Sequence, residues 1–269
     1  MTAEEKHFYT ENGYVQLGNV FSPDEVEEMS EEYDGIFERM SRDKESRLDT
    51  IWQGDWQQGL IPQVNKGDSD RNKTVKSIHN LQFHSATFTR CLLHPRLLDA
   101  LEDVMGTEDI LLHHTKAHLK PPGTGAPFPM HQDHGYFPFK NDSMVAAFIH
   151  LDDSDPDNGG LAVYPGSHKN GPLEDKASEP GYHHVDQEIY PLSGAAPVRA
   201  KKGDVVIFSY LLVHGSYLNT SDRVRRMLLI QCYAAHDQML AERHASPGLG
   251  MVLRGQNRNM HADIAKRHN

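Results

Sequence analysis

Hydrophobic residues in the first part of the chain recur at intervals of three and four, the spacing of a helix with one buried face. The pattern predicts a helix over about residues 3–12 and a second helix that begins at Pro23. Ser22 can cap the second helix and Glu25 completes a capping box, while proline suits the first helical position. A third helix is predicted over about residues 94–106, where a glycine ends it. The hydrophobic positions of the second helix are Val26, Met29, Tyr33, Ile36, Phe37 and Met40.

After residue 106 the pattern changes to short β-prone runs, separated by clusters of Gly, Pro, Asn and Asp. Strands with no helical pattern between them favour an antiparallel sandwich or barrel, and a closed jelly roll fits best. We therefore expect a mainly β fold with flanking helices, a cupin-like double-stranded β-helix with the N-terminal helices packed on one sheet. The runs are DILLHHTKAHLK (109–120), SMVAAFIHLDD (143–153), GLAVYPGSH (160–168), GDVVIFSYLLVHGS (203–216) and RRMLLIQCYAAH (225–236).

The organisation of the chain predicts one domain, because no internal repeat or low-complexity segment divides it. Two long segments, 45–75 and 169–197, lack a regular pattern, and loops of this length usually form lids or binding loops. The expected single domain covers residues 1–269, with a helical part over about 1–106, a jelly-roll core over about 107–240 and a C-terminal tail over 241–269.

Composition narrows the classes of protein that remain. Hydrophobic residues make up 38% of the chain, which is enough for a substantial core. With 27 basic and 38 acidic residues the net charge is −11, so the basic face of a nucleic-acid-binding protein is not expected. No apolar run approaches the ~18 residues of a membrane span, and MTAEEKHFYT is not a secretory signal. We expect Cys91 and Cys232 to be reduced and buried, in a cytoplasmic protein that binds a small molecule.

The H-x-D spacing of a metal site occurs four times, and 18 histidines make chance matches common. His131 and Asp133 follow a turn rich in Gly and Pro, and residues two apart in a strand face the same side. His214, at the end of an apolar strand, is the candidate third ligand; two imidazoles and a carboxylate with open positions suit non-haem Fe(II). Spacing alone equally allows that His131 is a core histidine held by a hydrogen bond and that His214 is an ordinary histidine at the end of a strand. The other matches are His150/Asp152, His184/Asp186 and His261/Asp263.

An arginine downstream of the third candidate ligand favours the metal-site interpretation. Arg225 lies eleven residues after His214, across a polar turn and at the start of the next strand. Arg225 and Arg226 face opposite sides of that strand, so one can point inward while the other meets solvent. A buried arginine needs an anion and can hold a carboxylate through two hydrogen bonds. A co-substrate with a carboxylate, such as 2-oxoglutarate, is therefore expected.

Three ordered motifs, HQDHGYFPF, DNGGLAVYPGSHK and KKGDVVIFSYLLVHGS followed by an arginine, resemble the phytanoyl-CoA dioxygenase family of Fe(II)/2-oxoglutarate oxygenases. The resemblance covers about residues 7–235 and includes an opening that looks like the family's helix, strand and helix. It implies that His131, Asp133 and His214 bind iron and that Arg225 holds the distal carboxylate of 2-oxoglutarate. Further co-substrate residues implied by position are Ser216, Lys76, Gln132, Phe148 in place of the family's tryptophan, and Lys116, or Thr115 if the register shifts by one.

The primary-substrate residues are expected among side chains near these motifs. His150 replaces a small residue of the family, on the same strand face as Phe148, and either contacts the substrate or hydrogen-bonds Asp152 or the backbone. The other candidates for substrate contact are His118, Tyr136, Trp52 and Trp56, for which packing is the alternative.

The resemblance implies an oxidoreductase that uses Fe(II), 2-oxoglutarate and O2, with ascorbate as a reductant in vitro. It would hydroxylate or otherwise oxidise an unactivated C–H bond of a small metabolite other than a CoA thioester, releasing succinate and CO2. Asp133 argues for hydroxylation, because halogenating relatives have a small residue there. The alternatives are a cupin-like Zn or Mn lyase or epimerase, and a non-catalytic, metal-stabilised binding protein.

Overall fold

The computed structural model describes residues 1–43, 50–52, 75–123, 125–177, 183–241 and 246–258. Its strands are β1 (Tyr14–Leu17), β2 (Thr50–Trp52), β3 (Val75–His79), β4 (Ile110–Lys120), β5 (Phe128–His131), β6 (Val145–His150), β7 (Leu161–Val163), β8 (Ala196–Pro197), β9 (Val205–Ser209), β10 (His214–Ser216), β11 (Arg225–Ala234) and β12 (Val252–Arg254). Its α-helices are α1 (Ala3–Asn12), α2 (Pro23–Asp43), α4 (Ala86–Leu92) and α5 (Pro95–Met105). Its short 3-10 helices are η1 (Leu81–Phe83), η2 (Asp133–Gly135), η3 (Ser167–Asn170) and η4 (Leu192–Gly194).

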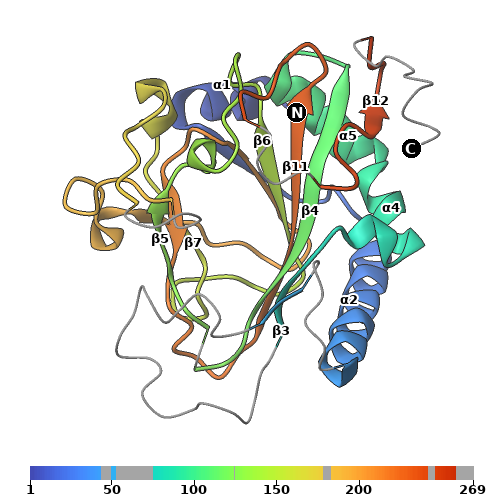
Figure 1. The fold of residues 1–269 in the computed structure, drawn as a ribbon. Coiled ribbons are helices and arrows are strands. Elements are labelled where there is room, and N and C mark those ends of the chain that lie inside the picture. The colour runs from blue at the N-terminus through green and yellow to red at the C-terminus, as the bar shows by residue number, and fades with distance from the viewer. Residues whose placement is uncertain (44–49, 53–74, 124, 178–182, 242–245, 259–269) are drawn as a thin grey trace.

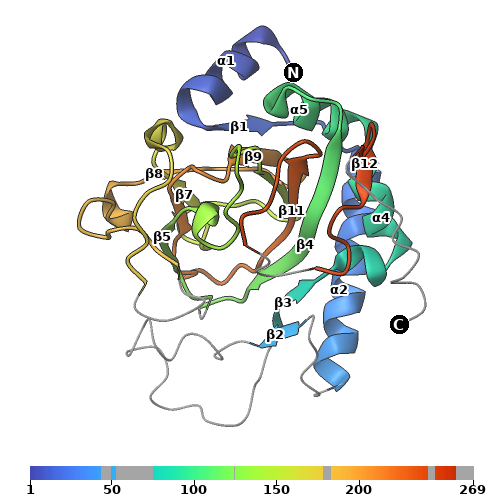
Figure 2. The ribbon, with the colours of Figure 1, turned by 45° about the horizontal axis from the view of Figure 1, so that its top comes forward.

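Within the described residues, the strands form two antiparallel sheets that curl toward each other (Figures 1 and 2). The larger sheet has the order β1-β9-β6-β11-β4-β3-β2, with β12 beside β4. The smaller sheet has the order β5-β10-β7-β8. The mainly β, cupin-like architecture that the sequence predicts is confirmed.

The larger sheet is buried on both faces. On its outer face α2, α4 and α5 pack against β4, β6 and β11 to form the main hydrophobic core. On its inner face, side chains such as Phe148, Met227 and Leu229 pack against Leu161 and Val163 of the smaller sheet. Because successive strand residues alternate between the two faces, neighbouring residues of β11 serve different layers. Strands buried on both faces are hydrophobic almost throughout, which explains the uninterrupted apolar runs of the sequence.

The three predicted helices are confirmed, and their ends follow from local chemistry. Ser22 and Glu25 form the predicted capping box, in which Glu25 accepts a hydrogen bond from Ser22 N at 2.7 Å. Gly106 ends α5 in the left-handed conformation, at φ 67°. The sequence pattern did not predict α4, a short helix of seven residues capped by Ser85.

One predicted strand is two strands in different sheets. Within the run 203–216, β9 belongs to the larger sheet and β10 to the smaller, and the connection between them crosses from one to the other. Residues on both sides of the crossing are buried, so hydrophobicity does not mark the break. β5 was also missed, since Pro129 interrupts its pattern; proline is tolerated there because β5 lies at a sheet edge.

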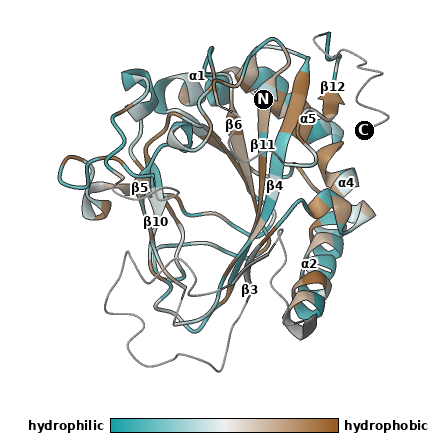
Figure 3. Ribbon diagram, in the orientation of Figure 1, coloured by the Kyte–Doolittle hydropathy of each residue, from teal (hydrophilic) through white to brown (hydrophobic). Residues whose placement is uncertain are grey.

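The strand β4 changes character along its length. It begins with Ile110–Leu112 and continues with the polar run His113–Lys116, so its ribbon changes from hydrophobic to hydrophilic (Figure 3). Residues of the N-terminal part also complete the larger sheet, since β1 pairs with β9 from Tyr14↔Phe208 to Leu17↔Val205. A polar stretch in a buried strand requires partners or a ligand, which draws attention to the inner face of β4.

Two further expectations concern cysteines and membranes. Cys91 and Cys232 are buried and unpaired, as predicted, and burial raises the pKa of each thiol to about 12. Among the helices that the structure describes, none combines the length and apolar character required to cross a bilayer.

Candidate metal centre

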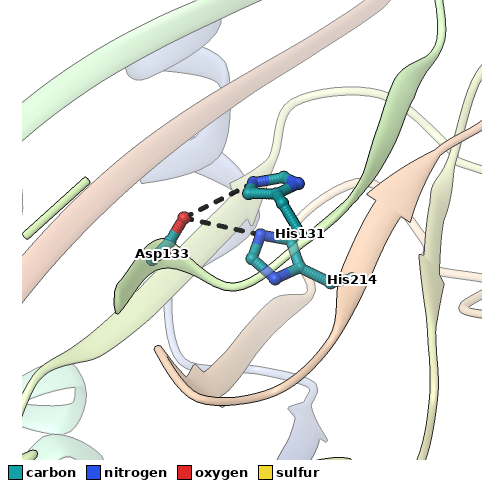
Figure 4. Close-up of side chains that lie close together, drawn as sticks. All are labelled: His131, Asp133 and His214. Atoms are coloured by element: carbon teal, nitrogen blue, oxygen red, sulfur yellow. Dashed lines mark ion pairs between the residues drawn. The ribbon is translucent and has the colours of Figure 1, made fainter. Parts of the chain in front are cut away.

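His131, Asp133 and His214 converge although they lie far apart in the chain (Figure 4). His131 ends β5 and His214 begins β10, and the two are register partners in the smaller sheet. Asp133 opens the η2 turn, and one ligand atom from each residue lies within 4.8 Å of the others. Asp133 Oδ1 lies 3.6 Å from His131 Nε2 and 3.7 Å from His214 Nε2. All three side chains are buried, so a rigid scaffold holds them.

Hydrogen bonds behind the two histidines fix which nitrogen faces the centre. His131 Nδ1 lies 2.8 Å from Pro129 O, and His214 Nδ1 lies 2.9 Å from Leu212 O. A carbonyl oxygen only accepts, so each Nδ1 must donate its proton, and each neutral ring presents the lone pair of Nε2. This is the tautomer of a histidine that binds metal.

Asp133 is held in its ionised form. Its Oδ2 accepts a hydrogen bond of 2.7 Å from Gln231 Nε2, which leaves Oδ1 toward the histidines. Burial acts to raise the pKa of this carboxyl, but attraction to His214 and the contacts with His131 and Gln231 outweigh it and lower the pKa. Burial, followed by repulsion from His131, lowers the pKa of His214 to about 4. Two imidazole Nε2 atoms and a carboxylate fit a divalent cation such as Fe(II), with positions left for other ligands.

Arg225 is buried on the inner face, and no carboxylate of the described residues pairs with it. It is 3% exposed, and its Nε has no hydrogen-bond partner among the described residues. Burial lowers the pKa of its guanidinium to about 10, while Tyr33 and Asp152 act in the opposite direction. The neighbouring Arg226 faces outward and pairs with Asp152 at 2.7 Å. The alternation predicted for the two arginines is therefore present, and the inner one is suited to a carboxylate.

Ser216 lies two residues beyond His214 and is buried in β10. Its Oγ accepts hydrogen bonds from Lys120 Nζ at 2.7 Å and from Phe128 N at 3.3 Å. Lys120 ends β4 and is the register partner of Arg225 on β11. Ser216 and Arg225 thus stand near each other at the same end of the two sheets, as a shared ligand requires.

Lys116 and Thr115 lie on opposite faces of β4. Thr115 Oγ1 accepts a hydrogen bond from Leu81 N at 2.8 Å and lies 2.7 Å from Gln82 Oε1, on the helical side of β4. These contacts hold the Thr115 hydroxyl on the helical side of β4, which favours Lys116 for the co-substrate position. Lys116 lies on the inner face, where Asp133 attracts its ammonium, although burial is the larger effect and lowers the pKa to about 8.

Replacing Lys116 with methionine is expected to stabilise the metal-free protein by about 1–3 kcal/mol at pH 7. The depressed pKa means that the charged amine opposes folding, fully below about pH 8, and that this cost fades as the pH rises toward 10.5. Urea denaturation of both proteins at pH 7 and pH 10 measures the difference. If Lys116→Met does not stabilise the protein at pH 7, or stabilises it more at pH 10, Lys116 is not a buried amine whose charge opposes folding.

The side-chain amide of Gln132 bonds backbone groups. Its Nε2 donates to Gly171 O at 3.0 Å and to Leu211 O at 2.6 Å, and its Oε1 accepts from Leu173 N at 2.8 Å. The amide is fully engaged with backbone that supports the metal centre. These contacts show that Gln132 supports the loops behind the two ligands that flank it, His131 and Asp133.

Phe148 and His150 share the inner face of β6, as predicted. Phe148 stacks edge-on against Phe208, which in turn contacts the ring of His214. His150 is fully buried, and its Nδ1 donates to Asp204 O at 3.3 Å, so the backbone alternative holds for that nitrogen. Its Nε2 has no partner among the described residues; burial, and next the charge of Arg225, lower its pKa to about 4. His150 therefore lies close enough to Arg225 to be affected by its charge.

Tyr136 and His118 lie near the centre, and three predicted residues cannot be placed. The ring of Tyr136 contacts His131 at 5.9 Å between centroids and stacks edge-on against His183. His118 is on the inner face of β4, in phase with Lys116. The side chains predicted at Lys76, Trp52 and Trp56 lie outside the described residues.

Two functional candidates escaped the sequence interpretation. Gln231 bonds Asp133, and Lys120 bonds Ser216, yet neither belongs to a motif. The alternation of side chains along a strand could have identified both residues. Gln231 is on the same face of its strand as Arg225, and Lys120 is on the same face as Lys116.

Comparisons with known proteins agree with this geometry. The family model for phytanoyl-CoA dioxygenase (PhyH) matches residues 9–227. A probable alpha-ketoglutarate-dependent hypophosphite dioxygenase of Stutzerimonas stutzeri is 30% identical over 244 residues, covering 88% of this chain and 80% of the relative. The peroxisomal phytanoyl-CoA dioxygenase of Bos taurus is 31% identical over 245 residues, covering 87% and 68%.

Solved structures show the same fold. EctD from S. alaskensis, crystallised with 2-oxoglutarate and 5-hydroxyectoine, superposes with a TM-score of 0.73 at 20% identity. The similarity covers 95% of this chain and 87% of that one.

Proposed function

Because the chain belongs to the phytanoyl-CoA dioxygenase family, we propose that it hydroxylates an unactivated C–H bond of a small-molecule metabolite and releases succinate and CO2. Its class, a 2-oxoglutarate-dependent non-haem iron dioxygenase, follows from that membership. The observation that carries the proposal is the pairing of a half-complete metal centre, His131, Asp133 and His214, with the buried cation Arg225. The metal centre has positions for a chelating ligand, and the buried arginine needs an anion. The keto acid end and the distal carboxylate of 2-oxoglutarate meet these two requirements.

The roles of the residues follow from their contacts. His131 and His214 would hold Fe(II) through Nε2 and Asp133 through Oδ1, while Pro129 O, Leu212 O and Gln231 keep these ligands oriented. Arg225 would hold the distal carboxylate of 2-oxoglutarate. When bound there, Fe(II) and 2-oxoglutarate supply the electrons that activate O2, so that one oxygen enters the substrate and the other succinate.

Apolar side chains around the site would exclude water. Phe148, Met227 and Leu229 line the inner face between the metal ligands and Arg225, and all three are buried. Exclusion of water protects a strong oxidant from side reactions. Lys116, beside Asp133, would balance negative charge brought by the co-substrate.

The substrate is proposed to be a small molecule. Relatives are named for hypophosphite, phytanoyl-CoA and ectoine, which are chemically diverse. We also propose that residues 1–269 form one domain, since β1 from the N-terminal part pairs with β9 of the core. Buried, unpaired Cys91 and Cys232 support a cytoplasmic location.

The test is release of CO2 and succinate from 2-oxoglutarate with Fe(II), O2 and ascorbate. We expect slow turnover without the substrate, and none with Zn(II) or with a His214→Ala variant. A Zn or Mn lyase or epimerase would leave 2-oxoglutarate intact, and so would a binding protein. No succinate from the iron-loaded protein with any candidate metabolite would overturn the proposal.

A further inference from the structure

We propose that Lys120 is a positioning residue that acts through Ser216: it holds the Ser216 hydroxyl as a hydrogen-bond donor, so that the co-substrate site selects a distal carboxylate. The inference rests on the proposed function, and it concerns a lysine outside every motif of the sequence. It also states a ligand class, namely 2-oxo acids whose far end accepts hydrogen bonds and donates none.

Lys120 is a buried ammonium with a defined position. It is 3% exposed, and its Nζ donates to Ser216 Oγ at 2.7 Å and to Tyr217 O at 2.5 Å. Asn219 Nδ2 holds the lysine backbone by donating to Lys120 O at 3.1 Å. Lys120 ends β4, whereas Ser216 ends β10, so the contact links the larger sheet to the smaller one beside Arg225.

Two glycines make room for the lysine stem. A Cβ at Gly125 would lie 2.8 Å from Lys120 Cβ, and a Cβ at Gly159 would lie 2.7 Å from Lys120 Cδ. A real Cβ atom essentially never lies within 3.0 Å of another heavy atom of this kind. Gly159 also has a φ of +83°, which other residues rarely adopt. A side chain at either glycine would therefore collide with the lysine stem, so both glycines allow Lys120 to extend toward Ser216.

The contacts of Ser216 fix the direction of its proton. A hydroxyl has two acceptor lone pairs and one donor hydrogen. Lys120 Nζ and Phe128 N both donate to Ser216 Oγ, and neither group can accept a proton in return. Among the described residues, none accepts a hydrogen bond from Ser216. Its hydrogen is therefore left for a ligand, and Ser216 is a donor at this site.

The far end of the site consequently offers donors. Arg225 carries N–H groups and no acceptor, and Ser216 contributes an O–H. A carboxylate satisfies both, since it only accepts. A primary amide of the same shape would turn N–H groups toward these donors, and it would leave buried groups unpaired. Without Lys120, the Ser216 hydroxyl can rotate and accept a hydrogen bond from an amide N–H. The site would then discriminate less between a distal carboxylate and a distal amide.

The first test measures binding of 2-oxoglutarate and of its 5-amide to Mn(II)-loaded protein by calorimetry, without O2. Lys120→Met should weaken 2-oxoglutarate binding about tenfold and should bring the affinities of acid and amide closer together. Lys120→Gln, which keeps a donor without the charge, should restore part of the difference. Lys202→Met removes an exposed lysine paired with Glu27 and should change neither affinity. An unchanged ratio of acid to amide affinity in Lys120→Met would overturn the inference.

The second test asks whether Lys120 acts through Ser216. In a Ser216→Ala background, Lys120→Met should cost less than a further ~2-fold in affinity, because coupled residues are not additive. A second full tenfold loss would overturn the inference. If Lys120→Met does not fold, Ser216→Ala alone must bring the affinities for 2-oxoglutarate and its 5-amide closer together. An unchanged difference between these affinities overturns the inference. Failure of the wild-type protein to bind 2-oxoglutarate would instead refute the proposed function.

Discussion

Replacing Asp133 with alanine is expected to lower the rate of 2-oxoglutarate decarboxylation at least about a hundredfold and to release the metal. Loss of a group that merely orients a ligand typically costs about 10–100-fold in metal affinity or activity, so loss of the ligand itself should cost more. The two remaining ligands, His131 and His214, are neutral, and only Asp133 supplies a negative charge. Succinate formation and the iron content after gel filtration measure both effects.

The chain contains a matched control for this variant. Asp186 stands in a second H-x-D pair but accepts hydrogen bonds from Glu188 N at 2.9 Å and Ile189 N at 3.4 Å, within a loop. Asp186→Ala should therefore leave iron content and turnover unchanged. Iron retained at the wild-type level by Asp133→Ala would show that the three side chains do not form the metal centre.

Replacing Arg225 with methionine is expected to weaken 2-oxoglutarate binding about a hundredfold or more. Removing one partner of a buried hydrogen-bonded charge pair costs about 2–5 kcal/mol, and each ~1.4 kcal/mol is a factor of ten. The metal-free variant should be at least as stable as the wild type, because it loses a buried cation that pairs with no carboxylate of the described residues. Titration with 2-oxoglutarate, and with 2-oxopentanoate, which lacks the distal carboxylate, separates the two ends of the co-substrate.

Arg226 provides the control, one residue away on the opposite face. It pairs with Asp152 and Asp34, both at 2.7 Å, so Arg226→Met should reduce stability and leave 2-oxoglutarate affinity unchanged. Binding of 2-oxopentanoate should not respond to Arg225→Met. Equal losses for the two co-substrates would mean that Arg225 supports the fold and does not hold the distal carboxylate.

For the neighbouring residues Arg225 and Arg226, the sequence predicts that they face opposite sides, and the structure shows which of them faces inward. The strand period alone predicts that Arg225 and Arg226 face opposite sides. Which of them faces inward depends on the register of β11 between β4 and β6, where Met227 pairs with both His118 and His150. A shift of one residue would exchange their roles. The same register places the Thr115 hydroxyl on the helical side of β4 and Lys116 on the side of Asp133.

His150 shows a similar limit. Its place on the face of Phe148 could be predicted, because residues two apart in a strand share a side. Its lack of a partner at Nε2 and its position toward Arg225 could not, since these depend on side chains from β11 and on the backbone at Asp204.

The sequence by itself determined the three longer helices, the capping box of α2, the mainly β class, and the residue types of the metal centre, because these depend on local spacing and chemistry. Only the tertiary structure decided that the run 203–216 crosses between sheets, that Gln132 binds backbone, and that Lys120 reaches Ser216. These are contacts between segments about 80 to 100 residues apart or strands in different sheets. No local pattern encodes them, since they arise when hydrophobic burial closes the two sheets on each other.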